Sequence, residues 1–282
     1  MYSLWNNTKT TLLMGLLMGL ALGVGYLIGG PQALIPALVI GGALNVFAFF
    51  FSDKIALASV GGREVSRQQA PELFDTVERL CRKGNLPMPR VCVSPAAAPN
   101  AFATGRGPAH AAVCVTAGLL EMLSPDELEG VLAHELGHVK SRDVLISTIA
   151  SVIGGAISVL AYFAFFFGGD NRRGNPLVGL ALMIFAPMAA GLIRMAISRS
   201  REYEADRYAA ELTGRPRGLA NALRKLANGN RRIPMPVPES QSNMFIVHPL
   251  TRRGEGMSKL FMTHPPIEQR IARLEAMNRG QL

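Results

Sequence analysis

The chain has 282 residues, of which 49% are hydrophobic and only 17% are charged, and its formal net charge is +9. Soluble domains carry roughly 25% charged residues and disordered chains are poor in hydrophobic ones, so this composition excludes disorder and favours a membrane protein with a moderate soluble part. The three cysteines, Cys81, Cys92 and Cys114, are sparse and cannot all pair, which excludes a disulfide-stapled secreted scaffold. No C-x-x-C occurs, which excludes a cysteine zinc site.

The N-terminal segment is predicted to form a transmembrane hairpin. No charged residue occurs between Lys9 and Asp53, and this run of 43 residues is long enough for two helical crossings of ~20 residues each. A cleaved signal peptide is the alternative for the first crossing, but the run far exceeds an h-region of ~7–15 residues. The predicted hairpin occupies 1–52, with spans at about 11–28 and 34–51 joined by Gly-Gly-Pro-Gln at 29–32.

Residues 53–143 are predicted to form the first part of a soluble domain. Apolar residues at helical spacing, closed by Gly84 and Asn85, predict one helix. Three short runs separated by Pro and Gly predict a small β-sheet. The helix is expected over 71–83, and the strands over 90–94, 100–104 and 112–116.

A second helix is expected to begin near the end of this segment. Ser124 is a favourable N-cap, Pro125 suits the first helical position, and Glu127 completes a capping box. The apolar residues that follow form a stripe that faces the core. This helix contains the motif His-Glu-Leu-Gly-His at 134–138.

The motif predicts a zinc site. His134 and His138 lie one helical turn apart on the same face, so both imidazoles can reach one ion at ~2.0–2.1 Å. Glu135, the neighbour of the first histidine, can hold a water molecule at the metal and take its proton. The alternatives are a surface helix with incidental histidines, or a site that has lost its metal.

The segment 144–193 is predicted to form a second transmembrane hairpin, with a pair of buried or re-entrant core helices as the alternative. Two uncharged runs predict its spans at about 144–168 and 175–193. The short connections between spans hold few Lys or Arg, whereas 53–143 holds 10 and 194–282 holds 16. By the positive-inside rule, both large segments and both termini are expected in the cytoplasm.

The segment 194–282 is predicted to complete the soluble domain and to supply the third zinc ligand. The metzincin pattern would require a histidine at 144, where Val144 stands, so a downstream glutamate is expected instead. Glu202 has Asp206 one turn away to orient a zinc-bound histidine, whereas Glu204 points elsewhere. Helices are expected at about 195–212, 216–228 and 266–278, with an irregular stretch up to 259.

Together, the His-Glu-Leu-Gly-His helix, the hydrophobic pair after it and Glu-Tyr-Glu-Ala-Asp at 202–206 resemble the HtpX family of membrane zinc metalloproteases, relatives of the CaaX prenyl endopeptidases. The resemblance implies one Zn²⁺ per subunit, held by His134, His138 and Glu202, with Glu135 catalytic. It also implies a multi-pass endopeptidase of the bacterial inner membrane that degrades damaged or misassembled membrane proteins as part of quality control and the stress response.

The resemblance implies further site residues. Residues Asn100, Ala101, Phe102 and Ala103 resemble the edge strand that pairs with an extended substrate, and such pairing suits broad specificity because it uses main-chain hydrogen bonds. His264 and Arg270 resemble a pair that reaches into the active site, where either could stabilise an oxyanion. The alternative for His264 is a structural histidine at a helix start.

The expected fold is mainly α, with four transmembrane helices and a cytoplasmic, gluzincin-like zincin domain that contains a small β-sheet. Its expected partners are protein or peptide substrates and the lipid bilayer. No nucleic-acid motif occurs, and the oligomeric state is left open. A binding protein without turnover is disfavoured because Glu135 is present, and a transporter because the spans hold no buried charge. An aminopeptidase is the alternative within zinc enzymes.

Overall fold

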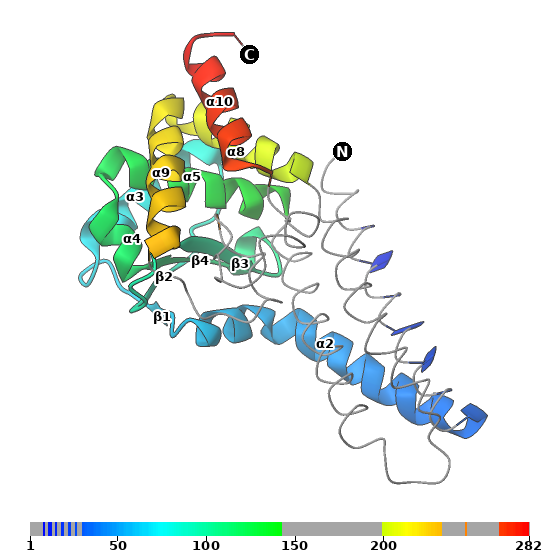
Figure 1. Ribbon diagram of the computed structural model, residues 1–282. Helices are drawn as coiled ribbons and strands as arrows, with labels where there is room; N and C mark the ends of the chain where they lie inside the picture. Colours follow the sequence, from blue (N-terminus) through cyan, green and yellow to red (C-terminus); the bar gives the residue numbers. More distant parts are fainter. Residues whose placement is uncertain are drawn as a thin grey trace.

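The computed structural model describes residues 30–142, 199–232, 246 and 265–281, together with single positions between 8 and 26. In these ranges a small β-sheet has helix α2 on one face and a layer of helices on the other (Figure 1). The expected second hairpin at 144–193 lies outside the described residues, as does most of the first expected span.

Helix α2 runs from Leu34 to Ser59, directly after the 3-10 turn η1 (Gly30–Ala33), and so extends beyond the end expected for the second span. Its last turns pack through Ala56 and Leu57 against the sheet, while its first half leaves large apolar side chains exposed. Among the described residues, no helix combines the length and apolar character that a membrane crossing requires.

The sheet contains four strands in the order β1-β2-β4-β3. Strands β2 and β4 are parallel, and the other two pairs are antiparallel, with Phe102 of β3 opposite Cys114 of β4. The three expected strands are confirmed to within one residue at each end, whereas β1 was not predicted because two residues carry no pattern. The strands are β1 (Arg63–Glu64), β2 (Arg90–Ser94), β3 (Ala101–Gly105) and β4 (Ala111–Thr116).

Two short elements that were not predicted flank β4, and the remaining described helices form the layer above the sheet. The expected helix at 71–83 is confirmed as α3, which ends at Asn85 in the left-handed conformation. The helices are η2 (Pro108–His110), α3 (Pro71–Gly84), α4 (Ala117–Met122), α5 (Pro125–Ser141), α8 (Arg199–Thr213), α9 (Pro216–Arg232) and α10 (Ile267–Asn278).

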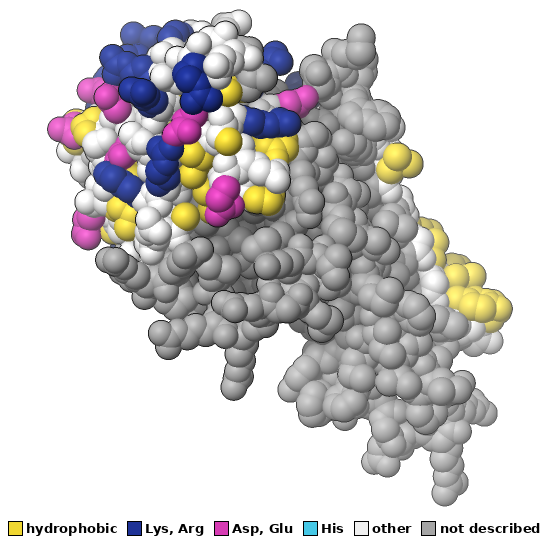
Figure 2. All heavy atoms as spheres, turned by 45° about the horizontal axis from the view of Figure 1, so that its top comes forward, with side chains coloured by type: hydrophobic (Ala, Val, Ile, Leu, Met, Phe, Trp, Pro, Cys, Tyr) yellow, Lys and Arg dark blue, Asp and Glu magenta, His cyan; other side chains and the backbone are white. Residues whose placement is uncertain are grey.

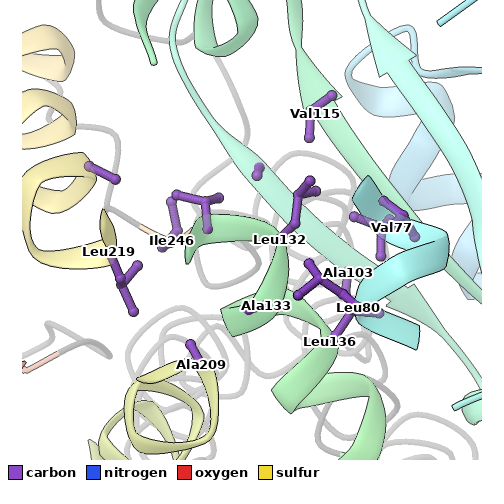
Figure 3. Packing of buried hydrophobic residues seen from close by; sticks show 14 of the residues in the cluster. Val77, Leu80, Ala103, Val115, Leu132, Ala133, Leu136, Ala209, Leu219 and Ile246 are labelled. Carbon is purple, nitrogen blue, oxygen red and sulfur yellow. The ribbon is translucent and has the colours of Figure 1, made fainter. Parts of the chain in front are cut away.

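The hydrophobic core lies on both sides of α5. Figure 3 shows Leu132 and Leu136 of α5 near Val77 and Leu80 of α3, and all four side chains are fully or almost fully buried. On its other side α5 packs against α8 and α9, which supply buried residues such as Leu219. Because α5 is held on every side, its position is fixed relative to the sheet and to α8.

Candidate metal centre

Helix α5 begins as the sequence predicted. Ser124 and Glu127 form a complete capping box, in which the Ser124 backbone N–H donates to Glu127 Oε2 at 2.8 Å. Such a box satisfies two backbone donors that a helix start otherwise leaves unpaired. The helix then carries His134 and Glu135 into the interior, where their exposed fractions are 0% and 3%, while His138 is partly buried.

A glycine inside the motif allows α8 to approach α5. A Cβ atom at Gly137 would lie 3.2 Å from Ala205 Cα and 3.1 Å from Tyr208 Cδ1, which is closer than side-chain packing normally permits. The missing side chain therefore lets the two helices meet at the level of the two histidines. The sequence analysis assigned no role to Gly137, although a glycine between the two histidines of the motif could have indicated a close approach by another element.

This close approach brings Glu202 of α8 to the two histidines. His138 Nε2 lies 3.2 Å from His134 Nε2 and 3.4 Å from Glu202 Oε1, and His134 Nε2 lies 3.7 Å from Glu202 Oε2. Donors at ~2.0–2.1 Å from a tetrahedral metal ion lie ~3.3–3.4 Å apart, so the observed spacing suits one ion. Two imidazoles and one carboxylate are also a ligand set of catalytic zinc sites, and these three residues could hold a metal.

Asp206 orients the first of these histidines. Its Oδ1 atom lies 3.0 Å from His134 Nδ1, on the side of the ring opposite the atom that faces His138 and Glu202. Burial followed by the Arg270 charge lowers the pKa of His134 to about 4, so its imidazole is neutral at pH 7, the form that binds a metal. The carboxylate then selects the tautomer by accepting the outer N–H.

Arg270 of α10 contacts the carboxylates of both Asp206 and Glu202. Its guanidinium is completely buried and donates to both oxygens of Asp206, at 2.7 and 2.8 Å, while another nitrogen lies 3.2 Å from Glu202 Oε2. Burial alone would raise the pKa of Asp206, but the charge and hydrogen bonds of Arg270 outweigh it and lower that pKa. The Ile246 carbonyl also accepts from Arg270 at 3.1 Å, a contact with no sequence signal.

Glu135 lies between the metal-binding side chains and strand β3. Burial raises the pKa of this carboxyl to about 8, and the nearby Glu202 adds to the shift, while the charge of His138 and a hydrogen bond from the Ala103 backbone oppose it. The contact with Ala103 means that the carboxyl faces the edge of the sheet. A group at this position lies between the candidate metal site and the strand expected to bind substrate.

Strand β3 is the last strand of the sheet, and the backbone N–H and C=O groups of successive residues point alternately to its two edges. The Asn100 carbonyl accepts from the backbone N–H of Thr116. The backbone groups of even-numbered residues therefore point to β4, and those of Ala101 and Ala103 point to the free edge. The N–H of Ala101 is already occupied by Asn100 Oδ1 at 2.9 Å. The whole strand is buried, including Phe102, and so is Asn100 directly before it.

The remaining site predictions fall in two groups. Glu204 is exposed on the side of α8 away from the histidines, as the helical register predicted. His264 lies outside the described residues.

Comparisons with known proteins agree with this geometry. The sequence profile of peptidase family M48 matches residues 67–278. A protease HtpX homolog of Salinibacter ruber is 50% identical over 272 residues, covering 96% of this chain and 98% of the homolog, and one of Syntrophotalea carbinolica is 52% identical over 280 residues, covering 96% and 99%. The crystal structure of Ste24p from S. mikatae resembles the fold, with a TM-score of 0.55 and 20% identity over 97% of this chain and 66% of that one.

Proposed function

Since the chain belongs to peptidase family M48 and is a metalloendopeptidase, we propose that it uses zinc to cut membrane and misfolded proteins at the cytoplasmic face of the bacterial inner membrane, in protein quality control and the stress response. The observation that carries the zinc assignment is the set of three donors, from His134, His138 and Glu202, separated by 3.2 to 3.7 Å. Asp206 completes the site by holding His134.

In this proposal Glu135 is the general base and acid. A zinc ion bound by the three side chains would polarise the scissile carbonyl and lower the pKa of water. Glu135 takes the proton from that water and delivers it to the leaving amine, because its carboxyl lies between the metal-binding side chains and strand β3. His264, from the family resemblance, is proposed to stabilise the oxyanion.

We assign Arg270 a positioning role. Its donors are directed to Asp206, Glu202 and the Ile246 carbonyl, and its Nη2 also lies 3.4 Å from both ring nitrogens of His134. Because it is completely buried, it acts through these metal-site residues. The substrate backbone is proposed to bind along Asn100, Ala101, Phe102 and Ala103, because β3 is the edge strand and Ala103 contacts Glu135.

The membrane assignment rests on the uncharged runs of the sequence, and exposed apolar side chains of α2 support it. Helix α2 exposes Ile35, Leu38, Val39, Val46 and Phe47 along its first half, while its last turns are fixed to the sheet. In this proposal the spans expected from the sequence cross the bilayer, so the protease domain lies directly at the membrane surface, in the cytoplasm by the distribution of Lys and Arg. Substrates are then cut in their cytoplasmic segments.

The proposed function is tested with purified protein in detergent. Metal analysis should find about one zinc per chain, and casein should be cleaved at internal bonds. A chelator should abolish cleavage, and added zinc should restore it. Cleavage that persists after the metal has been removed would contradict the proposal, and release of single N-terminal residues would indicate an aminopeptidase.

A further inference from the structure

The exposed apolar part of α2 ends at a charged surface that the proposed mechanism does not use. Large apolar side chains are exposed along the helix from Ile35 to Phe51, and its first charged residues, Asp53 and Lys54, follow directly. In Figure 2, the coloured side chains at the far right, away from the domain, are hydrophobic, whereas those of the domain include Lys, Arg, Asp and Glu. The surface therefore changes from apolar to charged within one turn of α2.

Two cations lie over the last two aromatic rings of this apolar part. Lys54 Nζ is 5.2 Å from the centroid of the Phe51 ring, and Arg106 Cζ is 5.0 Å from the centroid of the Phe50 ring. The side chains of Phe50 and Phe51 are 49% and 40% exposed. Because Lys54 follows Phe50 by four residues, it shares a helix face with the ring that Arg106 covers. Both cations therefore belong to one part of the surface.

The charges of these two cations are not balanced by a carboxylate. Asp53, the acidic residue of α2, pairs instead with Arg90 of β2. Within the described part of the chain, neither Lys54 nor Arg106 forms an ion pair. An aromatic ring attracts a cation but has no net charge, so both side chains keep their full positive charge. This surface therefore suits an anion that lies next to apolar groups.

A tight turn fixes Arg106 relative to the strand that is expected to bind substrate. Arg106 directly follows Gly105, the last residue of β3, whose φ of +127° lies in the left-handed region. A Cβ atom at Gly105 would lie 2.2 Å from the His110 carbonyl oxygen, so the turn requires glycine here. Gly105 also pairs with Ala111, the first residue of β4. A ligand that holds Arg106 would therefore also hold the end of β3.

We infer that Lys54 and Arg106 bind the headgroup phosphates of anionic phospholipids and so hold the end of β3 at the membrane surface. This inference rests on the proposed function, in which the span expected at about 34–51 crosses the bilayer and places Lys54 just outside it, in the cytoplasm. Basic residues at this level are attracted to the anionic headgroups of the cytoplasmic leaflet. A zwitterionic headgroup contains a cation of its own, which the two side chains would repel.

The test measures how tightly the full chain, in micelles of a neutral detergent, binds phosphatidylglycerol, with non-denaturing mass spectrometry as the readout. Phosphatidylcholine is the zwitterionic comparison, and glycerol 3-phosphate, which has the phosphate but no acyl chains, is the soluble competitor. The variants are Lys54→Gln, Arg106→Gln and the two combined. The control is Lys83→Gln, which removes an exposed positive charge from the end of α3, in the helical layer on the other face of the sheet.

For the parent and for Lys83→Gln, phosphatidylglycerol should bind more tightly than phosphatidylcholine. Each single variant at Lys54 or Arg106 should weaken phosphatidylglycerol binding about 5-fold, the usual effect of one basic residue near an anionic membrane, and the combined variant about 25-fold. Phosphatidylcholine should bind equally to all five proteins, and glycerol 3-phosphate should not displace phosphatidylglycerol. Zinc content and casein cleavage in the neutral micelles should stay at the parent level, because neither cation contacts the metal-binding side chains.

Several results would overturn the lipid site and leave the protease activity standing. The combined variant could bind phosphatidylglycerol like the parent, or Lys83→Gln could weaken binding as much as Lys54→Gln does. Equal binding of the two lipids by the parent, or displacement by glycerol 3-phosphate, would also contradict the site. Recovery of the parent from cells without detergent would overturn both the membrane placement and the lipid site. A parent protein without zinc or casein cleavage would instead contradict the proposed protease activity, whichever lipid it binds.

Discussion

His134 Nδ1 lies 3.0 Å from Asp206 Oδ1, and this contact joins α5 to α8 at the base of the candidate metal centre. It explains how two segments separated by the expected second hairpin act as one site. His134 comes from the first part of the soluble domain, and Asp206 comes from the second. Arg270 adds α10 to the same contact, so three separate stretches of the chain fix one imidazole.

This contact predicts how substitutions of three neighbouring acidic residues of α8 differ in their effect on zinc binding. Glu202→Ala should remove most bound zinc because it deletes a ligand. Asp206→Ala should lower zinc affinity ~10–100-fold, the usual effect of losing a group that orients a ligand. Glu204→Ala should bind zinc like the parent, since its side chain is exposed on another side of the helix. Zinc content after dialysis against a weak chelator measures all three.

A different order of zinc retention among these variants would contradict the assignment. If Glu204→Ala lost its zinc while Glu202→Ala kept it, the third ligand would be wrongly assigned. If Asp206→Ala kept parent affinity, then the contact with His134 would have no bearing on metal binding.

Glu135→Gln tests the base. The amide has the same shape but cannot accept the proton, so cleavage should fall by at least ~10²–10⁴-fold while zinc content stays at the parent level. Casein cleavage and metal analysis on the same preparation give both values. His138→Ala, which deletes a proposed ligand, serves as the comparison and should lose the metal as well as the activity. Activity within about tenfold of the parent in Glu135→Gln would rule out this role.

Local sequence patterns were sufficient to predict much of the fold and the residues that meet at the candidate metal centre. The capping box at Ser124 and the four-residue spacing of His134 and His138 are properties of one helix, so the sequence expresses them directly. Contacts between distant segments carry no such pattern. The Ile246 carbonyl that accepts from Arg270 and the two-residue strand β1 depend on tertiary packing alone, and neither was predicted.

Gly137 provides a test of how the helices meet. Gly137→Val would put side-chain atoms against Ala205 and Tyr208, and overpacking of this kind destabilises proteins by about 1–3 kcal/mol. Because α8 must move away, zinc affinity should fall together with the unfolding temperature. Ala272→Val, at an exposed position of α10, is the control and should change neither property. Unchanged zinc affinity in Gly137→Val would show that the close approach is not needed for the site.

The cysteines report the contact between α2 and the sheet. Cys92 and Cys114 are neighbours on β2 and β4, completely buried under the end of α2, and burial raises their pKa to about 11 and about 12. A thiol reagent at pH 8 should therefore modify them at least about 100-fold more slowly in native than in unfolded protein. Leu57→Ala should accelerate modification of both, but not of Cys81, which lies in the other core cluster. Equal acceleration at Cys81 would mean global destabilisation.

Labelling from outside the cell tests the proposed orientation in the membrane. In a cysteine-free background, a cysteine at Asn171 should react with an impermeant thiol reagent, because the proposal places the connection between the last two spans outside. A cytoplasmic probe must be accessible in the folded protein. Glu121 is exposed, so Glu121→Cys should react only after the membrane is permeabilised. Labelling at Glu121→Cys in intact cells, with none at Asn171→Cys, would reverse the orientation and place the metal centre outside the cytoplasm.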